Sequence, residues 1–191
     1  MKKIKSFREN EKDIGMINFK RLKRELVHRG SIIDFYTDTI QLPDGRTAKW
    51  DHVTHNGAAA VVPVNDDNNI LLVRQYRNSL DRATLEIPAG GINPGDTSTM
   101  ICAARELEEE TGFTAGSMEF LIRLKTAVAF TNENIDVYVA RNLTRTHQNL
   151  DPDEFIEIEE FRLKDIIQMI YEGQIEDAKT ISSIFAYAYN A

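Results

Sequence analysis

One stretch, from Pro88 to Phe113, constrains the fold of this chain more than any other, because a glycine-rich turn runs directly into a helix-like segment. The segment spans about Ser98–Thr111, and Gly112 then supplies the residue type that commonly ends a helix. Apolar residues recur within it at helical spacing, and they are Met100, Ala103, Ala104 and Leu107. The sequence therefore predicts an amphipathic helix that packs on a core immediately after a tight turn.

Acidic residues gather on one flank of this predicted helix. Glu106 and Glu110 lie one turn apart, and Glu109 lies one turn beyond Arg105, with which it can pair. Two like charges at this spacing repel by about 0.2–0.5 kcal/mol on a solvated helix. A divalent cation would reverse the repulsion, because Mg²⁺ binds one or two carboxylates together with water and substrate phosphates. The residues favour a metal site, with a solvated acidic face as the alternative interpretation.

The turn and the helix together resemble the Nudix box, which reads Gly, five residues, Glu, seven residues and then Arg-Glu-apolar-any-Glu-Glu-any-Gly-apolar. The second half is matched throughout residues 105–113, RELEEETGF. The first half differs, because counting from Gly90 puts Asp96 at the Glu position and leaves the next spacer one residue too long. Counting from Gly91 restores the spacer but puts Thr97 at that position. The chain is therefore similar to the Nudix family, with an insertion or a shifted register in the turn.

Outside the box, the chain resembles the ADP-ribose pyrophosphatases of that family through the segments VRQYR, LEIPAGG, DPDEFIEIEE and IEDAKT. The resemblance implies an α/β (α+β) fold, a Nudix-type α/β/α sandwich with a mixed sheet, preceded by an antiparallel β arm. Two domains are implied: residues 1–55 as a dimerisation arm that exchanges between subunits, and residues 56–191 as the catalytic domain. The expected assembly is a homodimer.

The resemblance also implies a metal site and a set of catalytic residues. Mg²⁺, with Mn²⁺ as a substitute, is expected at the carbonyl of Ala89 and at the carboxylates of Glu106, Glu109 and Glu110. The implied catalytic residues are Arg105 of the box and Glu154 as general base, with Glu157 as the alternative base. The acidic loop that carries Glu154 could close on a substrate, although such clusters are usually solvated.

Four residues are candidates for binding the substrate. Arg74 and Arg77 end a predicted strand just before the turn, where bidentate guanidinium groups would suit a diphosphate; an unspecialised surface pair is the alternative. The resemblance places Arg77 near the phosphates and Glu133 in a loop close to the site. Trp50 is either a half-buried hairpin residue or a stacking platform for a purine, and the resemblance places it near the base.

The rest of the chain reads as strands followed by two helices. Pro43-Asp44-Gly45 separates two β-rich runs, at 26–42 and 46–55, and predicts a hairpin that must pack on its own domain or on another subunit. His52 and His55 would point to opposite faces there, which makes them poor partners for a metal. Residues 1–25 show no regular period. Further strands are predicted at 58–64, 69–77, 83–87, 119–130 and 134–143, and helices at 162–173 and 177–191.

Composition excludes several classes of function. A net charge of −7 argues against nucleic-acid binding through bulk electrostatics, although residues 1–29 carry ten Lys or Arg against four Asp or Glu. The single cysteine, Cys102, rules out an internal disulfide and fits a reducing cytoplasm, and a packed thiol explains it. No apolar run reaches the ~18 residues of a membrane span, and the start lacks a signal-peptide pattern. We expect a soluble, cytoplasmic protein without a nucleic-acid or membrane partner.

These expectations combine into one reaction. The resemblance implies Mg²⁺-dependent attack of water on the diphosphate of a nucleoside diphosphate sugar, namely hydrolysis of ADP-ribose to AMP and ribose 5-phosphate. Two alternatives stay open: the same chemistry on a GDP-sugar or a dinucleotide, and a non-catalytic Nudix sensor that binds ADP-ribose. Such sensors typically lose box carboxylates, whereas Glu106, Glu109 and Glu110 are all present here.

Overall fold

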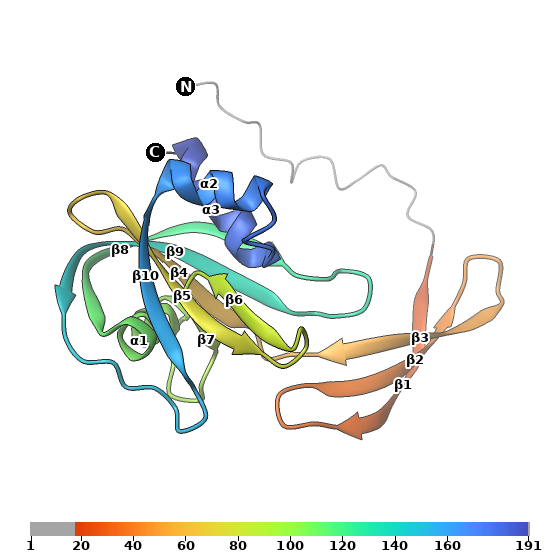
Figure 1. Cartoon of the computed structure of the whole chain (residues 1–191). Helices are drawn as coiled ribbons and strands as arrows, with labels where there is room; N and C mark the ends of the chain where they lie inside the picture. Colours follow the sequence, from red (N-terminus) through yellow and green to blue (C-terminus); the bar gives the residue numbers. More distant parts are fainter. Residues whose placement is uncertain (1–17, 191) are drawn as a thin grey trace. The chain divides into compact units, whose positions relative to one another are not determined.

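The structure is a computed structural model that describes residues 18–190. The chain divides into two units, Met1–Thr54 and His55–Ala191 (Figure 1). The exchange between subunits and the roles expected of these two parts remain predictions.

The first unit is a three-stranded antiparallel sheet in the order β1 (Lys20–Arg29), β2 (Asp34–Gln41), β3 (Thr47–Thr54). The predicted turn joins β2 to β3, with Gly45 at φ 87°. The continuous strand expected over 26–42 is wrong, because the Gly30 N–H turns back to the Ile33 carbonyl at 2.9 Å and ends β1. β1 also extends back to Lys20, into a stretch without a regular period; residues 1–17 of that stretch lie outside the described residues.

The second unit contains two sheets and three helices. One sheet has the order β7 (Ala89–Gly91), β4 (Ala58–Pro63), β9 (Asn134–Arg145), β8 (Phe113–Lys125), and its β4–β9 pair is parallel. The other sheet is antiparallel, with the order β10 (Ile156–Arg162), β5 (Asn69–Arg77), β6 (Arg82–Glu86). The helices are α1 (Thr99–Thr111), α2 (Leu163–Tyr171) and α3 (Ala178–Asn190).

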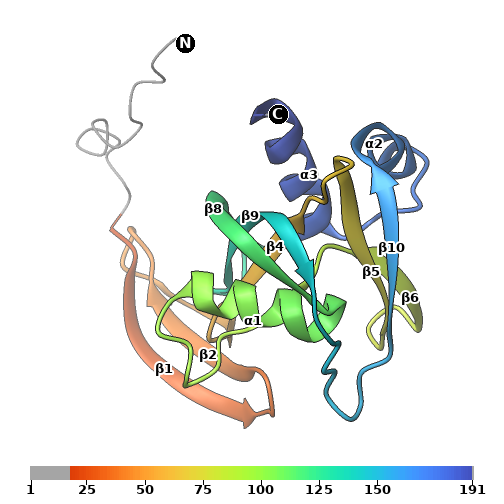
Figure 2. The ribbon, with the colours of Figure 1, turned by 90° about the vertical axis from the view of Figure 1, so that its left-hand side faces the viewer.

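Strand β4 lies at the centre of this unit because it is buried on both faces. Its even-numbered residues pack into a core with Ile166 of α2 and Ile184 of α3, while its odd-numbered residues face α1, where Val61 meets Leu107. Figure 2 shows α1 and the α2–α3 pair on different sides of the sheets. The expected α/β/α sandwich with a mixed sheet is confirmed.

Helix α1 begins and ends where the sequence predicts, but it buries a different face. Ser98 caps it by accepting from the Ile101 N–H at 3.2 Å, and Gly112 follows in the left-handed region at φ 65°. Met100 and Ala104 of the predicted stripe are exposed. The buried side instead carries Cys102, Ala103, Glu106, Leu107, Glu110 and Thr111. The helix is therefore rotated so that two glutamates point inward.

Two other differences concern chain segments near the site. The strand expected over 119–130 ends at Lys125, because residues 127–131 turn, with the Phe130 N–H donating to the Ala127 carbonyl at 3.1 Å. Helix α3 begins one residue later than expected, because Asp177 caps its first turn by accepting from the Thr180 N–H at 2.9 Å. Within residues 18–190, no helix is long and apolar enough to cross a membrane.

Candidate active site

The glycine turn and α1 approach so closely that a side chain at Gly90 would collide with the helix. A Cβ added there would lie less than 3.0 Å from three atoms of the Glu106 carboxyl group. The Ala89 N–H donates to Glu110 Oε2 at 3.3 Å, and the Cys102 thiol donates to the Gly91 carbonyl at 3.3 Å. Glu106 and Glu110 are thus both held against the backbone of β7.

Arg105 ties the turn to the helix. Its Nη1 lies 2.7 Å from Glu106 Oε1 and donates to Glu109 Oε2 at 2.7 Å, which confirms the pairing of Arg105 with Glu109 expected from their spacing. Its Nη2 and Nε donate to the two carboxylate oxygens of Asp96 at 3.0 and 3.3 Å, and this bonding lowers the pKa of Asp96. Asp96, which stands at the acidic position counted from Gly90, is therefore paired with the arginine of the box.

The two inward carboxylates are electrostatically costly. Burial raises the pKa of Glu106 to about 7 and that of Glu110 to about 8, and repulsion from neighbouring carboxylates adds to both shifts. A divalent cation would offset this cost, because hard ions bind carboxylate, carbonyl and water oxygens.

The donors at this position fit Mg²⁺. Across residues 18–190, no three His, Cys, Asp or Glu side chains converge at metal-binding spacing, and the carboxylate of Glu109 is turned to Arg105. A cation here would use Glu106 and Glu110, with the nearby carbonyl of Ala89, water and substrate oxygens completing the set. This donor set is the one Mg²⁺ takes when it binds through one or two carboxylates.

The two candidate bases, Glu154 and Glu157, line one hollow together with Arg74. The charge of Glu154 contributes to the raised pKa of both Glu106 and Glu110. Glu157 stands opposite Arg74 in the β10–β5 register, and residues directly opposite share a face of the sheet. The charge of Glu154 therefore acts on the carboxylates of the box, and the choice of Glu154 over Glu157 as the base stays a prediction.

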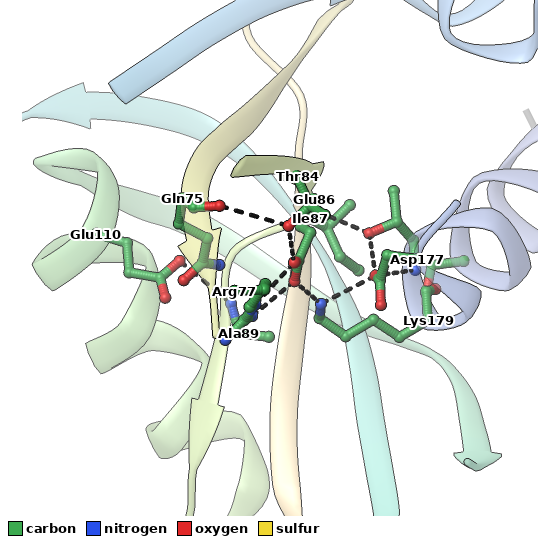
Figure 3. Close-up of polar contacts among 11 residues, drawn as sticks. Gln75, Arg77, Thr84, Glu86, Ile87, Ala89, Glu110, Asp177 and Lys179 are labelled. Carbon is green, nitrogen blue, oxygen red and sulfur yellow. Dashed lines mark hydrogen bonds and ion pairs between the residues drawn. The ribbon is translucent and has the colours of Figure 1, made fainter. Parts of the chain in front are cut away.

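The two arginines of β5 point to opposite faces of their sheet. Arg74 and Arg77 are three residues apart in a strand, and side chains alternate between faces. Arg74 donates to Glu159 at 2.5 Å, while Arg77 donates to Glu86 through Nε at 2.8 Å and Nη2 at 2.6 Å (Figure 3). Of the pair, the structure brings only Arg77 to the turn.

A cleft of about 390 Å³ connects Arg77 with the glycine turn. Its walls include Ala89, Glu133, His55 and Lys179. Glu133 accepts from the Thr126 hydroxyl at 2.5 Å and lies 3.4 Å from His55 Nδ1. The cleft therefore has the predicted Arg77 and Glu133 on its walls, together with two residues, His55 and Lys179, that sequence reasoning did not assign to the site.

Trp50 belongs to the first unit, in β3, where it is 48% exposed and its ring lies 5.5 Å from that of Phe19. Its role as a platform for the base stays a prediction.

Sequence reasoning also missed a partly buried polar cluster beside the cleft, formed by Glu86, Asp177, Lys179 and Thr180. A signal for it exists in the segments LEIPAGG and IEDAKT, which carry these residues and were noted without a role. Asp177 could have been identified as a helix cap from its residue type and position.

The chain is similar to several known proteins. The model of the NUDIX domain matches residues 54–184. The chain is 38% identical over 167 residues to a methanol dehydrogenase activator of Bacillus methanolicus, and 36% identical over 167 residues to an ADP-ribose pyrophosphatase of Bacillus subtilis (strain 168). Each match covers 86% of this chain and 90% of the relative. A crystal structure of an ADP compounds hydrolase superposes with a TM-score of 0.82 at 24% identity, over 90% of this chain and 93% of the other, which shows a shared fold.

Proposed function

Because this chain belongs to the Nudix family and is related to its ADP-ribose pyrophosphatases, we propose that it hydrolyses ADP-ribose to AMP and ribose 5-phosphate in the presence of Mg²⁺. The observation that carries the proposal is the pair of buried carboxylates, Glu106 and Glu110, which are held against the glycine turn. The same turn lines a cleft together with Arg77.

Four residues of the site take part directly in this reaction. Glu106 and Glu110 would hold Mg²⁺, which when bound neutralises phosphate oxygens and lowers the pKa of water. Glu154 takes the proton of the attacking water as the new phosphorus–oxygen bond forms and the bridging phosphorus–oxygen bond breaks. Arg77 binds the phosphates, with its planar guanidinium oriented toward the cleft by Glu86.

The test is a panel of nucleoside diphosphate derivatives incubated with Mg²⁺ and read as released phosphomonoester. ADP-ribose should be the best substrate by kcat/KM. If a GDP-sugar or a dinucleotide has the highest kcat/KM, the proposed substrate is wrong but the proposed chemistry stands. Tight binding without turnover of any compound would identify a sensor.

Variants of α1 test the metal site directly. Glu106→Gln and Glu110→Gln should each lower kcat by on the order of a hundredfold or more, because removing a metal ligand or its support costs at least tens-fold in activity. Glu108→Gln on the same helix is the matched control, since the Glu108 side chain is not among the buried residues. Normal rates in Glu106→Gln or Glu110→Gln would remove the metal-site assignment.

We also propose that the protein is a homodimer formed through its first unit. The support is a set of exposed apolar side chains on or beside its three strands, Phe19, Leu22, Leu26, Val27, Ile32, Ile33 and Trp50. A small sheet that exposes this many apolar side chains needs a partner to bury them. A cytoplasmic location remains part of the proposal, on the single reduced cysteine.

A further inference from the structure

The carboxylate of Glu86 is fully occupied by hydrogen-bond donors. It is 2% exposed, on β6, three residues before the carbonyl of Ala89. Oε1 accepts from Arg77 Nε at 2.8 Å and from the Thr84 hydroxyl at 2.6 Å, while Oε2 accepts from Arg77 Nη2 at 2.6 Å and from Lys179 Nζ (Figure 3). Four donors saturate the acceptor sites of a carboxylate. Glu86 is therefore neither a ligand for a cation nor a base, despite its place beside the turn.

Lys179 links this carboxylate to the start of α3. Its ammonium also contacts Asp177 Oδ2 at 2.9 Å, and Asp177 caps the helix through the N–H and hydroxyl of Thr180. The Thr180 hydroxyl in turn accepts from the Ile87 N–H at 2.9 Å. The first turn of α3 is thus attached both to Glu86 and to the backbone that enters the glycine turn.

The contacts leave one edge of Arg77 for a ligand. In the part of the chain that the structure describes, its guanidinium bonds through Nε and Nη2, both to Glu86, and its side chain remains 40% exposed on the wall of the cleft. A bidentate bond to a carboxylate fixes the plane of a guanidinium, which an arginine in open solvent would not keep.

We propose that Glu86, locked by Lys179, is a positioning residue that fixes the guanidinium of Arg77 in the orientation in which its remaining N–H groups meet the diphosphate. This inference rests on the proposed function, because it concerns how the same site holds its substrate. The segments LEIPAGG and IEDAKT, which resemble those of the ADP-ribose pyrophosphatases, would then act together to orient Arg77, since Glu86 comes from the first and Lys179 from the second.

A double-mutant cycle separates this role from a general structural one. If Glu86 acts through Arg77, Glu86→Gln should lower kcat/KM for ADP-ribose by about tenfold to a hundredfold, mostly through KM, as misplacement of a positioning group does. In an Arg77→Ala background the same change should cost about twofold or less, because the two effects are coupled. Lys179→Met should follow the same pattern, and Lys179→Arg should recover most of the loss.

Controls and stability are measured alongside. Glu176→Gln is the matched control, because it disturbs only the exposed pair with Arg82 at the same end of α3, and it should leave kcat/KM unchanged. Thermal melting establishes that each variant is folded at the assay temperature. If the Glu86→Gln variant is not folded at that temperature, Thr84→Val replaces it in the cycle, because this change removes one of the four donors to Glu86.

Three outcomes decide the matter. Coupled losses support the proposal. Equal losses with and without Arg77, or no loss in either variant, overturn it while leaving hydrolysis by the unaltered protein intact. If the unaltered protein turns over no substrate, the proposed function has failed instead, and the same cycle is read as the affinity for ADP-ribose by calorimetry.

Discussion

Replacing Gly90 with alanine should damage the metal site while leaving the fold in place. The added Cβ would lie less than 3.0 Å from the Glu106 carboxyl group, whereas comfortable carbon contacts need about 3.5 Å or more. Gly90 does not have a left-handed φ, so the collision itself is the whole perturbation. The three atoms nearest to the added Cβ all belong to the Glu106 carboxyl group, so relief comes from a retreat of that group by roughly 1 Å.

The expected changes in stability and activity follow from the displacement of the Glu106 carboxylate. A carboxylate at the end of a side chain can shift at a cost of about 1–3 kcal/mol, the usual range for overpacking, so the protein should still fold. A displacement of about 1 Å in a catalytic group can cost on the order of a hundredfold in rate. We therefore expect Gly90→Ala to raise the Mg²⁺ concentration needed for half-maximal activity and to lower kcat at saturating Mg²⁺.

The neighbouring glycine provides the control. A Cβ at Gly91 would meet nothing within 4 Å, and its φ is not in the left-handed region either. Gly91→Ala should show near-normal Mg²⁺ activation and melting temperature. The reasoning is refuted if Mg²⁺ titrations of the two variants coincide, or if Gly90→Ala fails to fold while Gly91→Ala folds.

Three further predictions concern other parts of the chain. Glu154→Gln should lower kcat far more than it raises KM, because a base acts in the transition state, and Glu157→Gln should have little effect. If steady-state kinetics instead show the large loss of kcat in Glu157→Gln, the base was misassigned. The pKa of Glu86 is lowered from 4.5 to about 2 in the folded protein, so ionised Glu86 should contribute about 3 kcal/mol to the free energy of unfolding above pH 5. This contribution should vanish as the pH falls from 4.5 toward 2. The free energies of unfolding of the unaltered protein and of Glu86→Gln should therefore converge at low pH, and a constant difference between them would contradict this. Removing residues 1–50 should leave a particle with the mass of one truncated chain by light scattering, and a particle with the mass of two truncated chains would rule out dimerisation through the first unit.

Most of the architecture could be predicted because it is encoded locally. The cap at Ser98 and the stop at Gly112 are both residue types whose backbone preference fixes a helix end. The face of α1 could not be predicted in the same way. Hydrophobic periodicity treats every glutamate as exposed, so it favoured a stripe through Met100 and Ala104, whereas the helix turns Glu106 and Glu110 inward.

The two arginines of β5 illustrate a signal that was present but not used. Strand alternation separates Arg74 from Arg77, as it separates His52 from His55, and it would have assigned only one arginine to the site. The partner of Arg77 had no such signal. Glu86 and Lys179 are 93 residues apart in sequence and meet only because the first turn of α3 lies beside the end of β6. Such a contact depends on tertiary structure and cannot be read from spacing.

The site contains two kinds of carboxylate, and their donors explain how one protein can use both near neutral pH. Burial alone would raise the pKa of Glu86, but the hydrogen bonds from Arg77 and Lys179 outweigh it and lower the pKa to about 2. Glu106 and Glu110 are buried with too few donors, and their pKa values rise to about 7 and 8.

Environments that separate the pKa values of neighbouring acidic groups in this way usually give those groups different roles. A carboxylate whose four acceptor sites are filled cannot compete for a cation, so Glu86 can stand three residues from Ala89 without diverting Mg²⁺ from the helix. The under-bonded pair gains most from a cation, because the cation replaces the donors that the protein withholds. Which carboxylates of this site bind the cation therefore follows from how many hydrogen-bond donors reach each of them. Removing Lys179 should leave Glu86 with one acceptor site unfilled, so that Glu86 can compete for the cation.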